Sequence, residues 1–393
     1  MRAYLGAAAC ARVADEMVGV AVVLLVLHRT SSPALAGAMV TAYTLPSIVS
    51  GPVLGAWLDR ATHRRAILAG GGLLLAAATA GVALTAGRSW VPFALAVLTG
   101  FAVPLTSGGY SSLVPHLVPA SGLARANALD AAVFNVAAIA GPGLAGVLAA
   151  ALSPDAAVLA ISGLALVGAA LTALLPAVPP VPRERSGLLS TVRAGVRHLV
   201  RTPPLLGATL TSALSLGSVG VLATALPLRT AELGAGQSAA GLVWAALEVG
   251  CLAATLVLGR RLQDRRVDLV VYACTAAYGV AMLTWPLAGS LVVLLALALA
   301  AGLVEGLALP GIMATRQRHS PPELLAQVSI TGASLKVGGF ALGAALGGWL
   351  VPAAGPGTAI AVVAAAQLGA AALGWAVGRY SVAVPIRSER PAQ

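Results

Sequence analysis

The chain has 393 residues, of which 59% are hydrophobic and only 9% are charged. Soluble domains carry about 25% charged residues and disordered segments combine low hydrophobicity with high charge, so both classes are excluded and a protein of the lipid bilayer is favoured. The net charge of +11 does not indicate a nucleic-acid partner, because the arginines fall in small groups between apolar runs instead of forming one basic face with aromatic residues.

Twelve apolar segments are long enough to cross a membrane, since a helix needs about 20 residues to span the hydrocarbon core. The predicted spans are 3–27, 33–58, 66–86, 90–113, 126–152 and 156–175, followed by 205–228, 239–258, 267–287, 291–314, 326–351 and 358–377. Arg12, Asp15 and Glu16 interrupt the first span. A cleaved signal peptide is the alternative there, but three charges precede the apolar run and favour an uncleaved helix.

The arginines between the spans are distributed unevenly. Cytoplasmic loops are enriched in Lys and Arg, so the richer set of connections predicts a cytoplasmic (inner) membrane protein with both termini in the cytoplasm. That set holds Arg60, Arg64, Arg65, Arg183, Arg185, Arg193, Arg197, Arg201, Arg260, Arg261, Arg265, Arg266, Arg316 and Arg318, the tail adds Arg379, Arg387 and Arg390, and the other set holds Arg29, Arg88 and Arg229.

The longest connection, 177–204, is rich in Pro and Arg and divides the chain into halves at 1–176 and 205–378, with a tail at 379–393. Within it, apolar residues from Leu188 to Leu199 recur at helical spacing with arginines between them. This pattern predicts either a helix lying on anionic lipid headgroups or an exposed basic linker. An internal repeat supports the division: at an offset of 202 residues, Pro119 matches Pro321 and Gly141 matches Gly343.

A motif lies between the second and third spans, which reads Gly55-Ala-Trp-Leu-Asp59-Arg60-Ala-Thr-His-Arg64-Arg65. Gly55 allows close approach of a neighbouring helix, and Asp59 can pair with Arg or lie at the positive N-terminus of another helix. The motif resembles the signature loop of the major facilitator superfamily, Gly-x-x-x-Asp-Arg-x-x-x-Arg-Arg.

This resemblance implies an all-α integral membrane protein with 12 transmembrane helices in two pseudo-symmetric six-helix halves. Secondary transporters of this design bind a substrate between the halves and alternate its access. In the family the signature loop is a cytoplasmic latch that favours one access state. The alternative for its arginines is membrane topology alone.

A second resemblance lies in the fifth span, where Gly141-Pro142-Gly143-Leu-Ala-Gly146 is similar to the Gly-Pro-x-x-Gly-Gly element of the family's antiporters. It implies a helix kink and export by exchange, and the alternative is a generic kink with a small-residue packing surface. The fourth span contains no Arg, whereas many proton-coupled drug antiporters of the family carry one there. A mechanism that relies on that Arg is therefore not predicted.

Ionisable side chains inside the spans are the candidate site, because each costs about 2.5–3.5 kcal/mol at mid-bilayer and usually faces a cavity or a partner. A proton-coupled carrier needs a carboxylate that is neutral in one access state and charged in the other. The candidates are Asp15, Glu16, Glu248 and Glu305.

The remaining membrane charges have local interpretations. We expect Arg12 to pair with Asp15 or Glu16 on the same helix face, and Asp130 to interact with the positive end of its own helix. Glu305 could instead form a structural ion pair with Lys336. By resemblance to the family, the residues predicted to line the cavity and contact substrate are Arg12, Tyr43, Tyr110, Phe134, Trp244 and Lys336.

The sequence offers no phosphate-binding loop, no metal-ligand spacing and no catalytic constellation, so we predict no cofactor, no metal and no enzymatic activity. The predicted function is a monomeric secondary transporter of the bilayer that uses protons to export small amphipathic or drug-like compounds. A proton-coupled importer of a small nutrient is one alternative. A non-transporting membrane sensor is an alternative of another class.

Overall fold

The computed structural model describes residues 1–30, 33–86, 90–176, 188–236, 239–259 and 266–379, and within these ranges every regular element is a helix. The first half contains α1 (Arg2–Thr30), α2 (Pro33–Thr44), α3 (Pro46–Arg60), α4 (Arg64–Thr85), α5 (Val91–Gly100), α6 (Val114–Leu117), α7 (Leu123–Ala151) and α8 (Pro154–Ala173). After α9 (Leu188–Arg201), the second half contains α10 (Pro203–Val219), α11 (Leu222–Glu232), α12 (Ala240–Leu258), α13 (Val267–Met282), α14 (Leu291–Glu305), α15 (Ala308–His319), α16 (Leu325–Ala354) and α17 (Pro356–Arg379).

Ten helical segments in the described ranges are long and apolar enough to cross a membrane, and α10 with α11, which are bent by 41°, forms an eleventh. The twelfth span is α1, whose 29 residues exceed the length a bilayer requires although it carries three charges near its middle. The predicted all-α fold with two six-helix halves is confirmed.

Several spans are interrupted by proline, which has no N–H to donate. The second span is divided into α2 and α3 before Pro46, and the tenth into α14 and α15 before Pro310. In the tenth span the carbonyl of Gly306 lacks its usual donor at Pro310, and Thr255 of α12 donates its hydroxyl to that carbonyl at 2.5 Å. The break is therefore satisfied by a neighbouring helix, next to Glu305.

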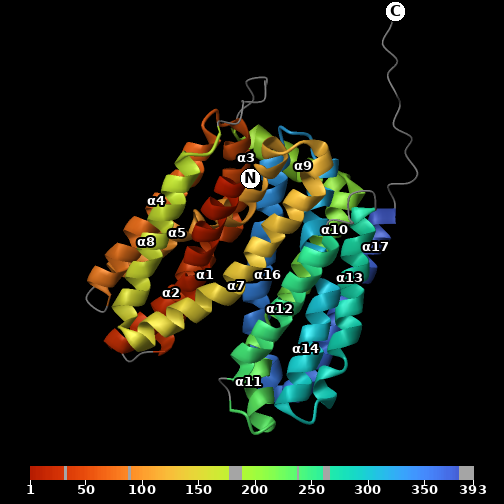
Figure 1. Cartoon of the computed structure of the whole chain (residues 1–393). Helices are drawn as coiled ribbons and strands as arrows, with labels where there is room; N and C mark the ends of the chain where they lie inside the picture. Colours follow the sequence, from red (N-terminus) through yellow and green to blue (C-terminus); the bar gives the residue numbers. More distant parts are fainter. Residues whose placement is uncertain (31–32, 87–89, 177–187, 237–238, 260–265, 380–393) are drawn as a thin grey trace, which may run out of the picture.

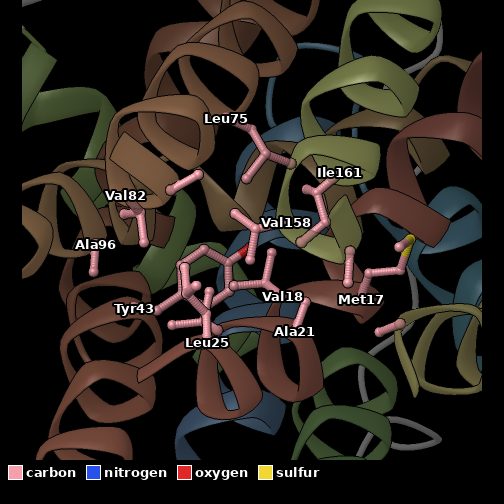
Figure 2. Packing of buried hydrophobic residues seen from close by; sticks show 14 of the residues in the cluster. Met17, Val18, Ala21, Leu25, Tyr43, Leu75, Val82, Ala96, Val158 and Ile161 are labelled. Atoms are coloured by element: carbon pink, nitrogen blue, oxygen red, sulfur yellow. The ribbon is translucent and has the colours of Figure 1, made fainter. Parts of the chain in front are cut away.

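Each half has its own hydrophobic core. In the first half, Met17, Leu25, Leu75, Val158 and Ile161 pack together from α1, α4 and α8, as Figure 2 shows. A second cluster joins α11, α13, α14 and α17 in the other half. A third cluster joins the halves, because Ala326 and Ile330 of α16 pack with residues of the first half such as Leu58 and Leu105.

The halves meet mainly at the end of the bundle that contains α9 and the signature loop, which we call the arginine-rich end. Figure 1 shows the halves close together there, beside the N-terminus, and diverging toward α2 and α11. The backbones approach closely: a Cβ on Gly108 would lie 2.7 Å from Cα of Ile330 in α16. Some of the arginines that predict the topology lie outside the described residues: Arg88, Arg183, Arg185, Arg260, Arg261, Arg265, Arg387 and Arg390.

The helical spacing of the apolar residues in the central connection corresponds to a helix, α9 (Leu188–Arg201). One face packs against the second half, where Leu199 joins Leu205 and Val328. Its other face is exposed and combines Arg193, Arg197 and Arg201 with apolar side chains. Contact of this face with lipid headgroups stays a prediction.

Candidate functional site

Arg12 of α1 forms a buried ion pair with Asp130 of α7. The distance from Nη1 of Arg12 to Oδ1 of Asp130 is 2.7 Å, and the two residues are 1% and 0% exposed. Asp130 also accepts hydrogen bonds of 2.7 Å from the hydroxyls of Tyr4 and Ser111, and the Arg12 guanidinium lies 3.6 Å above the Phe134 ring. The predictions made for Arg12 and for Asp130 are therefore both wrong.

Arg12 does not pair with its helix neighbours Asp15 or Glu16, and Asp130 does not interact with the positive end of its own helix. The reason is packing, because α1 and α7 lie against each other and bring Asp130 to Arg12 together with two more donors. A carboxylate with three donors is a better partner than one on the same helix face. The ion pair leaves Asp15 and Glu16 without an arginine.

Asp15 and Glu16 lie at a cavity between the two halves that encloses about 1000 Å³ of empty space, open solvent included. Asp15 accepts a hydrogen bond from the hydroxyl of Tyr43, and Glu16 is exposed to the cavity. At Glu16 the fifth span comes very close, since a Cβ on Gly141 would lie 2.5 Å from the Glu16 Cβ. Gly141 of the predicted antiporter element thus packs directly beside a candidate proton carrier.

Glu248 and Glu305 line a second cavity in the other half, together with Trp244, with about 800 Å³ of empty space, open solvent included. Leu216, Leu309, Ile312 and Lys336 line both cavities, so the two cavities adjoin, and we call them together the central cavity. Lys336 lies at their junction. All four predicted carboxylates therefore converge on one space from both halves.

Glu305 and Lys336 do not form the ion pair that was the structural alternative. Among the ion pairs of the described residues, neither side chain takes part. Oε2 of Glu305 is buried without a hydrogen-bond partner. Both groups remain available to a proton or a ligand in the cavity.

Arg316 is the residue that sequence reasoning placed wrongly. The predicted position of Arg316 is a cytoplasmic connection, but the residue is only 8% exposed and lines the central cavity. Its Nη1 donates to the carbonyl of Ser329 at 3.2 Å, whereas Nε and Nη2 have no hydrogen-bond partner. The sequence held no local signal for this, because Arg316 and Arg318 follow the same apolar run.

Other predicted residues lie away from the shared cavity. Tyr110 is 2% exposed and its hydroxyl bonds to Thr172 at 2.6 Å inside the first half. Tyr43 lines an apolar pocket of α1, α2, α4 and α5. Pro142 lies inside the continuous helix α7, and Gly146 faces open space. In the described residues no group of three or more His, Cys, Asp or Glu could hold a metal ion.

The signature loop contacts the other half. Oδ1 of Asp59 accepts the backbone N–H of Ala326 at 2.9 Å, and Oδ2 accepts that of Gln327 at 2.8 Å, at the N-terminus of α16 where a carboxylate is favoured. A Cβ on Gly55 would lie 2.4 Å from Cα of Gln327, so glycine permits this approach. Arg64 lies 3.9 Å from Oδ1 of Asp59.

The other arginines of the loop have separate partners. Arg60 donates to the Thr191 hydroxyl in α9 at 3.4 Å, and Arg65 to the Leu175 carbonyl at 2.8 Å. Nearby, the amides of Asn127 in α7 and Gln317 in α15 bond to each other twice, at 2.7 and 2.9 Å. Of these contacts, the amide pair joins the two halves directly, Arg60 contacts α9, and the bond of Arg65 lies within the first half.

Comparison with known proteins identifies the family. The model of the Major Facilitator Superfamily matches residues 4–329 and 208–392. The MFS-type transporter y4rN of Sinorhizobium fredii is 30% identical over 364 residues, which cover 88% of this chain and 87% of that protein.

Three solved structures share the fold, and their sequence identities of 16–19% indicate similarity of fold alone. The human organic anion transporter MFSD10 is 16% identical with a TM-score of 0.78 over 95% of this chain and 98% of that one. A bacterial homologue of the iron transporter ferroportin, in an outward-facing state, is 19% identical with 0.75 over 96% and 99%. The E. coli fucose:proton symporter is 16% identical with a TM-score of 0.73 over 96% of this chain and 97% of that one.

The chain belongs to the major facilitator superfamily and is a multi-pass membrane transporter.

Proposed function

We propose that this transporter exports small amphipathic compounds across the cytoplasmic membrane in exchange for protons. The observation that carries the proposal is the convergence of Asp15, Glu16, Glu248 and Glu305 on one cavity shared by the two halves. Among the described ion pairs none contains any of these carboxylates. Four acids without an arginine or lysine partner are costly in a membrane unless they exchange protons or bind a ligand.

Binding of a proton changes the charge of a cavity carboxylate. A proton can neutralise a carboxylate in one access state and leave it in the other. Since the halves carry separate hydrophobic cores, they can rock around the cavity with the carboxylates protonated or with substrate bound. Each complete cycle then moves protons and substrate in opposite directions across the membrane. The membrane potential supplies about 2.3 kcal/mol per charge per 100 mV.

The arginine-rich end is the cytoplasmic side in this proposal, as the enrichment of arginine predicts. The contacts of Asp59 with α16 and of Asn127 with Gln317 close that end. The structure then represents an outward-facing state, in which the cavity receives protons from outside. Protons enter from the side where they are more concentrated, as proton-driven export requires.

Export as the direction is supported by the antiporter-like element, because Gly141 packs against Glu16. Uptake together with protons is the second candidate, and Arg316 and Lys336 favour it. An anion near these cations and a proton on a nearby carboxylate would stabilise each other. Such mutual stabilisation moves both ligands in the same direction, as in a symporter.

The test is accumulation of fluorescent and antibiotic compounds in efflux-deficient cells, measured with and without a protonophore. We expect expression of the protein to lower accumulation, and the protonophore, Asp15→Asn or Glu248→Gln to abolish that effect. Asp155→Asn and Glu232→Gln are matched controls, since both residues form ion pairs outside the cavity, with Arg29 and Arg229. Export that persists with the protonophore, or uptake instead of export, would overturn the proposal.

A further inference from the structure

We propose that Arg316 and Lys336 form a subsite of the central cavity that binds the carboxylate group of the transported compound, which is therefore an organic acid. The inference rests on the proposal that this cavity holds the substrate, because it names the chemical class of that substrate. It does not depend on whether transport is export or uptake.

The first argument is that neither cation forms an ion pair among the described residues, although Glu248 and Glu305 line part of the same cavity. Arg316 is 8% exposed and Lys336 lines both parts of the cavity, yet the ion pairs of the described residues include neither. Arg12 lines the same cavity but is neutralised by Asp130. A buried charge without a partner is strongly unfavourable, so an anion in the cavity would remove a cost that the protein alone leaves in place.

The second argument is the local packing, which brings the guanidinium to the face of α16 that carries Lys336. A Cβ on Gly332 would lie 2.3 Å from Nη2 of Arg316, so the absence of a side chain at Gly332 leaves space for the guanidinium. Lys336 follows Gly332 by four residues in α16 and thus lies on the same face, one turn or about 6 Å along the axis. The two cations border one small region of the cavity.

The third argument concerns the kind of anion. A guanidinium recognises a planar carboxylate through two parallel N–H bonds, and in Arg316 Nη1 donates to Ser329 while Nε and Nη2 are buried without a hydrogen-bond partner. Apolar side chains surround the pair, among them Leu309, Ile312 and Val337. This combination suits a carboxylate attached to an apolar body better than a small, strongly hydrated ion.

The test compares probes that differ only in charge. Binding of benzoate, benzamide and benzylamine, and of 2-naphthoate, 2-naphthamide and 2-naphthylmethylamine, is measured on the purified full-length protein at pH 6, from the ligand-induced rise of the thermal unfolding midpoint. The carboxylates are expected to bind at least about tenfold more tightly than the amides. The amines should bind no better than the amides.

Arg316→Gln should reduce the preference for carboxylate over amide at least about tenfold, and Lys336→Gln should reduce it independently. Arg318→Gln, an exposed arginine two residues away, should leave the preference unchanged.

The inference is also overturned if no carboxylate binds, if amides bind as tightly as carboxylates, or if Arg316→Gln keeps the preference. These outcomes are independent of the proposed function, because equilibrium binding needs no proton gradient. Protonophore-sensitive transport without carboxylate preference would reject the subsite alone. Carboxylate binding without protonophore-sensitive transport would reject proton coupling alone.

Discussion

Replacing Asp59 with Asn should open the arginine-rich end of the molecule. The carboxylate accepts two backbone N–H bonds of 2.9 and 2.8 Å from Ala326 and Gln327, and hydrogen bonds to a charged group contribute about 1.5–3 kcal/mol each. Asparagine keeps one acceptor, presents an NH₂ group to the second donor and loses the charge at the helix N-terminus. We expect the closed state to lose about 3 kcal/mol, or roughly a factor of 150 in its equilibrium.

The assay is a distance measurement between spin labels on His63→Cys and Arg318→Cys, one exposed position in each half. The background lacks Cys10, Cys251 and Cys274, which are the free cysteines. The unsubstituted background should give one short distance, and Asp59→Asn a second, longer population of comparable size. The control Asp155→Asn removes an acid outside this contact. An unchanged distribution in Asp59→Asn would show that these hydrogen bonds do not hold the end closed.

Three further changes test the surrounding structure. Arg12→Met should lower the free energy of unfolding by about 3–5 kcal/mol, because it leaves the Asp130 carboxylate buried without an ion-pair partner. Adding Asp130→Asn should recover part of that loss in a double-mutant cycle. Additive losses would contradict the pairing. Burial and the nearby Arg64 lower the pKa of His116, so the unfolded protein gains its proton first and stability falls as the pH drops below about 6.5. His116→Gln should flatten the dependence of the unfolding midpoint on pH between 7.5 and 5.5. Replacing Arg193, Arg197 and Arg201 with Gln should slow transport in phosphatidylglycerol vesicles and not in neutral ones, because each arginine near an anionic surface contributes about 1 kcal/mol; equal rates in both would favour an exposed linker.

Features that depend on local sequence were predictable. Hydropathy predicts the twelve spans because a bilayer demands long apolar helices. The spacing of apolar residues predicts α9 within the central connection. One of the two arrangements expected for Asp59, at the N-terminus of another helix, is the one observed. The sequence alone did not identify α16 as that helix, because the contact joins residues more than 260 positions apart.

Features that depend on packing between distant segments were not predictable. The pairing of Arg12 with Asp130 spans 118 residues, and the nearer acids at positions 15 and 16 were the obvious local partners. Arg316 and Arg318 look alike in sequence, but the helix turns the first toward the cavity and leaves the second exposed. The break of the tenth span also needs Thr255 from another helix to satisfy the Gly306 carbonyl.

The most direct test of proton coupling by the cavity carboxylates is proton flux in proteoliposomes that contain a trapped pH-sensitive dye. Flux is recorded when a compound identified in the accumulation assay is added, for the wild type, for each of Asp15→Asn, Glu16→Gln, Glu248→Gln and Glu305→Gln, and for the variant with all four changes. We predict compound-dependent proton movement in the wild type and none in the fourfold variant, with compound binding retained. Proton flux of wild-type size in the fourfold variant would contradict the account.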